Sequence, residues 1–173
     1  MDLSFTPVNG QKVCEYAGRR FGWLRFGNNG CGVLAVYNAL GLLGRKPSFA
    51  GLFGYFHAWY RPRFFGVFPW QIRRYFKKQA IPFRRERSLQ ELEEGLKGGG
   101  VAVLTYWNRC GELFGKRFPK PLRGAHSVAV FYEDKFTVCN RYSNRDRFYK
   151  YDSLEELLKD GLLIKAFYLK EGT

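Results

Sequence analysis

Hydrophobic residues form an almost unbroken run between Cys31 and Leu43 in the first third of the chain. The run ends at Gly44, and Pro47 follows shortly afterwards, which is a common way for a helix to end. The run is apolar on every side and not along one stripe only. It therefore predicts a helix buried at the centre of the fold.

Amphipathic spacing and capping residues predict two further helices. Pro69 stands at a helix start, and apolar residues follow at helical spacing through Ala80, with basic residues on the opposite face. Ser88 begins a capping box, so a helix runs from there to Lys97. The stretch 49–76 is rich in aromatic residues, which either line a groove or form ordinary core.

Apolar runs in the second half of the chain predict strands. These strands are Val101–Trp107, Ala125–Tyr132, Phe136–Asn140 and Leu162–Leu169. The polar turn Glu133-Asp134-Lys135 joins the second and third strands into a hairpin, and a helix capped by Ser153 precedes the last strand. Segments 1–27 and 108–124 are predicted to be loops. Helices come mostly first and strands mostly later, so we expect one α+β domain over residues 1–173.

The cysteines, the first ten residues and the lengths of the apolar stretches limit the cellular compartment and the chemistry that we expect. The four cysteines are far apart, and only two histidines accompany them, so we expect neither a zinc site nor any other metal or cofactor. The first ten residues lack the basic start and apolar run of a signal peptide. No uncharged apolar stretch approaches the roughly 20 residues of a membrane span. We expect reduced thiols and a cytoplasmic location.

The chain is strongly basic, with a formal net charge of +14 and a pI of about 9.8. Such a surface attracts anions at long range, so an anionic partner is one interpretation. Basic residues interleaved with aromatic ones also allow a nucleic-acid-binding domain as an alternative. The basic pairs are dispersed, however, and none forms a specific nucleic-acid motif. The oligomeric state does not follow from the sequence.

Cys31 lies where the polar turn Asn28-Asn29-Gly30 becomes the first turn of the buried helix. Backbone N–H groups at a helix start lack intrahelical partners and carry the positive end of the helix dipole. They therefore favour a thiolate, which is the nucleophilic form of cysteine. We expect Cys31 to be a nucleophile with a lowered pKa.

A cysteine nucleophile needs a base, and His126 is the better placed of the two histidines. It begins an apolar strand directly after Gly124-Ala125, and Asn140 closes the partner strand. A two-residue turn would set His126 opposite Arg141, whereas a three-residue turn over 132–134 would set it opposite Asn140. We predict a turn that is not of two residues, with Asn140 orienting the histidine ring.

These residues resemble the papain-like cysteine peptidases. The resemblance consists of Asn29-Gly30-Cys31-Gly32 opening an apolar helix, the segment 124–128 around His126, and Asn140 downstream. It is closest to the compact bacterial branch that includes bacteriocin-leader-processing peptidase domains. It implies a nucleophile helix packed on a small antiparallel sheet that carries the His/Asn hairpin. It also implies a peptide or protein substrate, Cys31 as nucleophile, His126 as general base and acid, and Asn140 as the orienting residue.

One position departs from that pattern. Such peptidases commonly carry a glutamine about six residues before the nucleophile as an oxyanion donor, and Arg25 stands there in this chain. Asn28 or Asn29 could supply the side-chain donor instead. Gln11 is too far upstream to fill the role by spacing, although the fold could still return it to the site. A decayed, binding-only relative is the alternative. Related acyl-transfer reactions use the same residues, so the reaction subtype stays open.

Overall fold

A computed structural model of the protein describes residues 4–58, 66–108, 110–113, 116–119, 124–159 and 161–170. Six strands form one antiparallel sheet in the order β3-β10-β4-β7-β8-β9. The strands are β3 (Arg84–Glu86), β4 (Val101–Trp107), β7 (Ala125–Tyr132), β8 (Phe136–Cys139), β9 (Tyr149–Tyr151) and β10 (Leu162–Leu169). The bounds of β4, β7 and β10 are those that the apolar runs predicted, because these three strands form the centre of the sheet.

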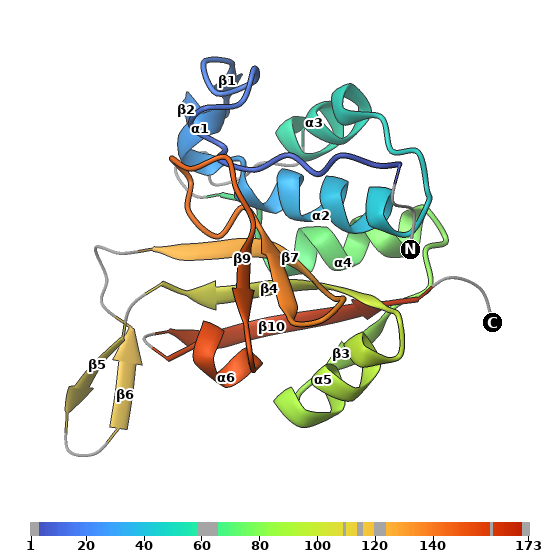
Figure 1. The fold of residues 1–173 in the computed structure, drawn as a ribbon. Helices are drawn as coiled ribbons and strands as arrows, with labels where there is room; N and C mark the ends of the chain where they lie inside the picture. Colours follow the sequence, from blue (N-terminus) through green and yellow to red (C-terminus); the bar gives the residue numbers. More distant parts are fainter. Residues whose placement is uncertain are drawn as a thin grey trace.

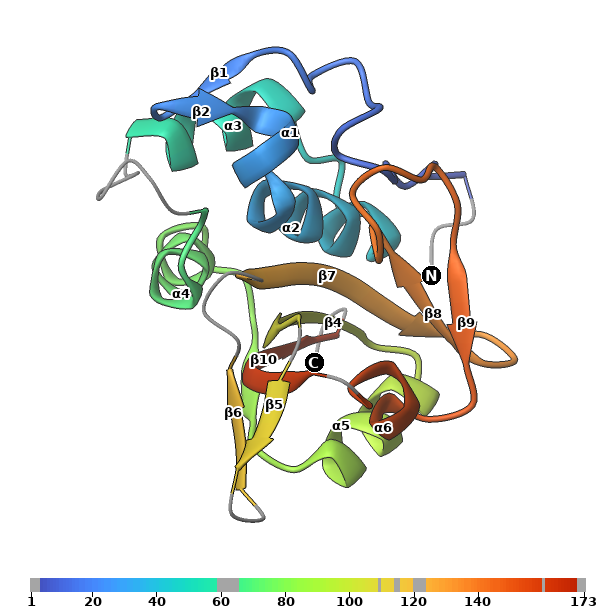
Figure 2. The same cartoon turned by 90° about the vertical axis from the view of Figure 1, so that its left-hand side faces the viewer.

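Helices cover both faces of this sheet (Figures 1 and 2). The helices are α2 (Cys31–Leu42), α3 (Phe49–Ala58), α4 (Pro69–Lys78), α5 (Leu89–Lys97) and α6 (Leu154–Leu157). Helices α2 and α4 pack on one face around Val103, Ala129 and Phe167, and α3 packs on α2 in the same hydrophobic cluster. Helices α5 and α6 pack on the other face around Leu104 and Val128. The predicted α+β class is therefore correct.

Helix α2 is the centre of the larger hydrophobic cluster. Every residue of α2 except Tyr37 is buried, and the helix lies across β7 and β4. Val33, Leu34 and Val36 are fully buried, and each such side chain stabilises the fold by about 1.5–3 kcal/mol. The first turn of α2, which carries Cys31, is consequently held against β7.

Close packing explains the two glycines that flank Cys31. A Cβ added at Gly32 would lie 2.6 Å from the Cβ of Val67, and one added at Gly30 would overlap the ring of Phe26. Neither glycine has a positive φ. Gly30 and Gly32 therefore serve to bring neighbouring segments close to the cysteine turn.

The hairpin of β7 and β8 has a three-residue turn. Tyr132 pairs with Phe136, so the turn consists of residues 133–135. The prediction that the turn is not of two residues is confirmed, but the turn lies one residue later than the 132–134 turn that we considered. Strand β8 ends at Cys139, one residue early, because Asn140 adopts a φ of +57°.

The two predicted loops contain short elements, so those predictions were wrong in part. The N-terminal segment holds β1 (Arg20–Phe21), β2 (Leu24–Arg25) and α1 (Phe26–Asn29), and a separate hairpin pairs β5 (Cys110–Leu113) with β6 (Lys116–Pro119). Elements of two to four residues are too short to show a hydrophobic period.

Most described aromatic residues of the 49–76 stretch belong to the core. Phe49, Phe53 and Phe56 on α3 pack in the cluster around α2, and Phe76 on α4 contacts Phe167 on β10. The core interpretation is therefore correct for most of the described aromatic residues of this stretch, and its other aromatic residues, Trp59, Tyr60, Phe64 and Phe65, lie outside the described part of the chain. Among the described residues, no helix is both long and apolar enough to cross a membrane.

Candidate active site

A cleft of about 870 Å³ opens at the N-terminal ends of α2 and β7. Its described lining includes four residues that the sequence singled out, namely Cys31, His126, Asn28 and Asn29. Asn140 lies behind the wall of the cleft and is fully buried. The structure thus brings together residues that are almost 100 positions apart in the chain.

Cys31 is buried, with 8% of its surface exposed. Burial raises the pKa of its thiol, and hydrogen bonds from Ser127, Gly32 and the backbone of Cys31 itself oppose this rise without cancelling it. The expectation of a lowered pKa from the helix start was therefore wrong, because desolvation of the thiolate outweighs the N–H groups. Cys31 is therefore a neutral thiol near pH 7.

Ser127 is a site residue that the sequence reasoning missed. It follows His126 on β7 but, because side chains alternate along a strand, points to the opposite face of the sheet, toward α2, where its backbone and hydroxyl lower the pKa of the Cys31 thiol. Its hydroxyl also lies 2.9 Å from that of Thr105, its partner on β4. A serine within an apolar strand has no local sequence pattern that marks it as a site residue, because only tertiary packing brings Cys31 close to it.

His126 is buried and held in one tautomer. Its Nε2 lies 2.6 Å from the backbone oxygen of Asn140, and since a carbonyl oxygen only accepts, Nε2 carries the proton. Burial lowers the pKa of His126 to about 4, although the Asn140 carbonyl raises it, and the nearby charge of Arg141 lowers it further. The ring is therefore neutral near pH 7, and Nδ1 is its basic nitrogen.

Asn140 orients the histidine through its backbone and not, as we predicted, through its side chain. The side-chain Nδ2 donates to Gln11 Oε1, and the side-chain Oδ1 accepts from the Gln11 backbone N–H, each over 3.1 Å. The Asn140 backbone N–H donates to Asn9 Oδ1 at 2.8 Å. These three bonds fix the left-handed backbone that aims the Asn140 carbonyl at His126.

The fold returns Gln11 to the cleft although it precedes Cys31 by 20 positions. Gln11 is buried, lines the cleft and donates from Nε2 to the backbone oxygen of Gly27 at 3.0 Å. A primary amide has two N–H bonds, and Gly27 takes only one of them. Arg25, at the position expected for a glutamine, is exposed and is not among the described residues that line the cleft.

Cys31 and His126, the predicted nucleophile and base, are both uncharged near pH 7. Within the described part of the chain, no hydrogen bond joins the Cys31 sulfur to the His126 ring. Catalytic hydrogen bonds are often long without substrate and shorten when it binds. A proton transfer from the thiol to Nδ1 would convert the neutral pair to a thiolate and an imidazolium.

The described residues contain no group of three or more His, Cys, Asp or Glu side chains that could hold a metal. Cys14, Cys31 and Cys139 are free thiols. His57, the other histidine, packs on Phe21 and Phe53 and is not among the described residues of the cleft.

Neither a family model nor a curated protein matches the sequence. The functional assignment therefore depends on the geometry of the cleft.

Proposed function

We propose that the protein is a thiol peptidase or a related acyl-transfer enzyme of papain-like type, with Cys31 as nucleophile and His126 as base. The observation that carries this proposal is the shared cleft, which is lined by a helix-start cysteine and by a histidine whose Nε2 donates to the Asn140 carbonyl. That bond leaves Nδ1 as the only proton acceptor on the ring. A general base needs such a free ring nitrogen, so this tautomer supports the assignment of His126.

In the first step, Nδ1 of His126 takes the proton of the Cys31 thiol as the sulfur attacks a substrate carbonyl. The S–C bond forms, and the carbonyl π electrons move to the oxygen. His126 then gives the proton to the leaving amine, and the C–N bond breaks to leave a thioester on Cys31. Water, losing its proton to His126, attacks the thioester and releases the acid with the regenerated thiol.

The developing oxyanion requires hydrogen-bond donors near the first turn of α2. The backbone N–H of Cys31 is one donor, because N–H groups at a helix start lack intrahelical partners. The second N–H of the Gln11 amide is the favoured side-chain donor, since Gln11 is buried and fixed at both ends of its amide. Asn28 and Asn29 line the same cleft and are the alternatives.

The test is incubation of the purified protein with a peptide library, followed by mass spectrometry of the products. We expect cleavage at defined bonds by the wild type and none by Cys31→Ala or His126→Ala. Hydroxylamine should trap the acyl group as a hydroxamate if the thioester forms. Peptide binding without cleavage or acyl transfer would indicate a binding-only relative and would contradict the proposal.

A further inference from the structure

The wall of the cleft beside His126 contains an arginine that forms no ion pair with any acidic residue in the described part of the chain. Arg141 lines the cleft and is half-buried, and it follows the Asn140 carbonyl that holds His126. None of the ion pairs among the described residues involves Arg141. The described lining of the cleft also contains Lys12 but no aspartate or glutamate.

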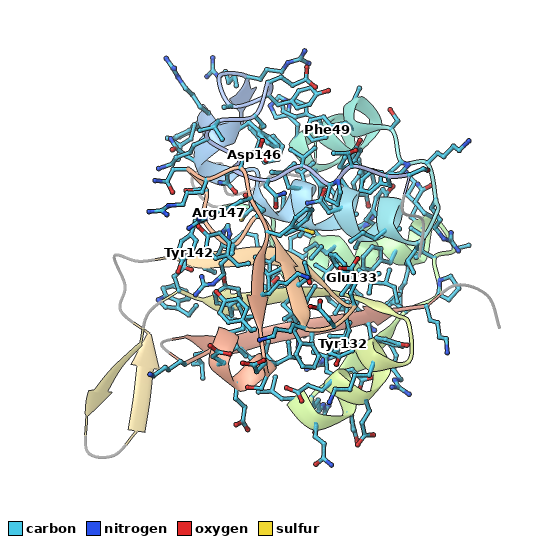
Figure 3. The ribbon with its side chains drawn as sticks, viewed as in Figure 1. Phe49, Tyr132, Glu133, Tyr142, Asp146 and Arg147 are labelled. Carbon is cyan, nitrogen blue, oxygen red and sulfur yellow. The ribbon has the colours of Figure 1, made fainter. Side chains whose placement is uncertain are left out.

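Tyrosine side chains hold the Arg141 guanidinium in place. Nη1 donates to the hydroxyl of Tyr106 at 2.8 Å, and Nε donates to the hydroxyl of Tyr151 at 3.2 Å. The guanidinium also lies over the rings of Tyr106 and Tyr142, 5.3 and 5.0 Å from their centroids. Figure 3 shows Tyr142 on the loop that follows β8. An arginine fixed by hydrogen bonds and ring contacts loses little side-chain freedom when it binds a ligand.

The tyrosines do not supply the missing negative charge. Burial raises the pKa of Tyr106 well above its ordinary value and also raises that of Tyr151, so both phenols stay protonated at neutral pH. Asp146, the acidic residue of the same loop, is exposed and is not among the described residues that line the cleft (Figure 3). A half-buried cation without a counter-ion favours an anion from outside.

We infer that Arg141 forms a carboxylate-binding subsite beside the nucleophile, so that the protein prefers acidic peptide substrates. The fork of the guanidinium matches a carboxylate, and two of its N–H groups already hold tyrosine hydroxyls. The remaining N–H groups are available to the ligand, and Lys12 adds positive charge at the exposed rim. This inference rests on the proposed function only in placing the substrate beside Cys31.

The test uses alkylating reagents that differ in charge but share the reacting group. Iodoacetate, N-iodoacetylglycine and N-iodoacetyl-4-aminobutyrate place a carboxylate at three distances from the reacting carbon, and each has a neutral carboxamide counterpart. Peptide mass spectrometry follows modification of Cys31, and the readout is the anionic-to-neutral rate ratio divided by that of glutathione. The ratio cancels differences in thiol reactivity, whereas the absolute rate with the neutral reagents tests the proposed function separately.

For at least one reagent length we expect the anionic-to-neutral rate ratio of wild-type Cys31 to be about tenfold higher than that of glutathione. A factor of this size corresponds to one charge-assisted hydrogen bond. Arg141→Met should abolish this preference, and Arg141→Lys, which keeps the charge and most of the packing, should retain part of it. Arg45→Met removes the same charge beyond the far end of α2 and should leave the ratio unchanged. Ratios that match glutathione at every length, or that fall equally in Arg45→Met, would overturn the inference.

Discussion

Replacing the buried Asn140 side chain distinguishes a structural role of its amide from a direct role in the reactivity of the site. If the backbone carbonyl orients His126 and the side chain only holds Gln11, then loss of the side chain should reduce stability far more than reactivity. Asn140→Gly is the more informative variant, because glycine adopts the φ of +57° without strain. Asn140→Ala removes the same amide but adds that strain.

The expected loss of stability follows from the bonds. The substitution leaves two buried groups of Gln11 without partners, its backbone N–H and its Oε1, and each such loss costs about 1–3 kcal/mol. Glycine also increases the freedom of the unfolded chain, by about 0.5–1 kcal/mol. We expect Asn140→Gly to lower the free energy of unfolding by about 3 kcal/mol. Asn140→Ala should lose a further 0.5–1 kcal/mol or so, because left-handed strain of about 1–2 kcal/mol exceeds the entropy difference.

Urea unfolding measures the stability, and alkylation of Cys31 by iodoacetamide at pH 7, under conditions where the variant is folded, measures the site. Asn140→Gly should react within about threefold of the wild-type rate, since roughly 0.6 kcal/mol corresponds to that factor. If Asn140→Gly is as stable as the wild type but its Cys31 no longer reacts, the reasoning is refuted. That result would mean that the amide itself acts on His126.

Three further predictions concern the core of the site. Between pH 8 and pH 5 the wild type should lose about 2 kcal/mol of stability that His126→Gln does not lose. The reason is that His126 binds a proton below pH 6.5 in the unfolded chain but only near pH 4 in the folded protein. Equal shifts of the urea midpoint in both proteins would disprove this. Gly32→Ala should lower stability by about 1–3 kcal/mol through contact with Val67, whereas Gly54→Ala, with open space around its Cβ, should be neutral or stabilising in thermal melts. Gln11→Ala should lower kcat on a cleaved peptide about 10²–10³-fold if its amide is the oxyanion donor, and an unchanged kcat would assign that role elsewhere.

The central elements were predictable because their signals are local. Helix α2 and the strands β4 and β7 are long apolar runs that are buried on both sides, so their patterns are not ambiguous. Strand β10 is only partly buried, but it is also a mainly apolar run with clear ends. Cys31 and His126 stand at the ends of such runs. Their positions in the cleft therefore followed from the element order.

The rest of the site depends on long-range packing that no local pattern encodes. Gln11 reaches Asn140 across 129 positions, and Ser127 meets Cys31 only because α2 crosses β7. The direction of the thiol's pKa shift also depends on burial, which competes with the helix start and exceeds it. The role of Asn140 differed because its left-handed backbone turns the carbonyl, and not the amide, toward the ring.

The most direct test of the Cys31–His126 pair is the pH dependence of Cys31 alkylation by iodoacetamide, followed by peptide mass spectrometry in the wild type and in His126→Ala. The wild type should keep reacting from pH 8 down to about pH 5, because neutral Nδ1 takes the proton from the thiol, and should lose reactivity as His126 protonates near pH 4. In His126→Ala the rate should fall about tenfold for each pH unit below the thiol pKa. Two coincident profiles, each with the single ionisation of an unassisted thiol, would contradict the pairing of Cys31 with His126.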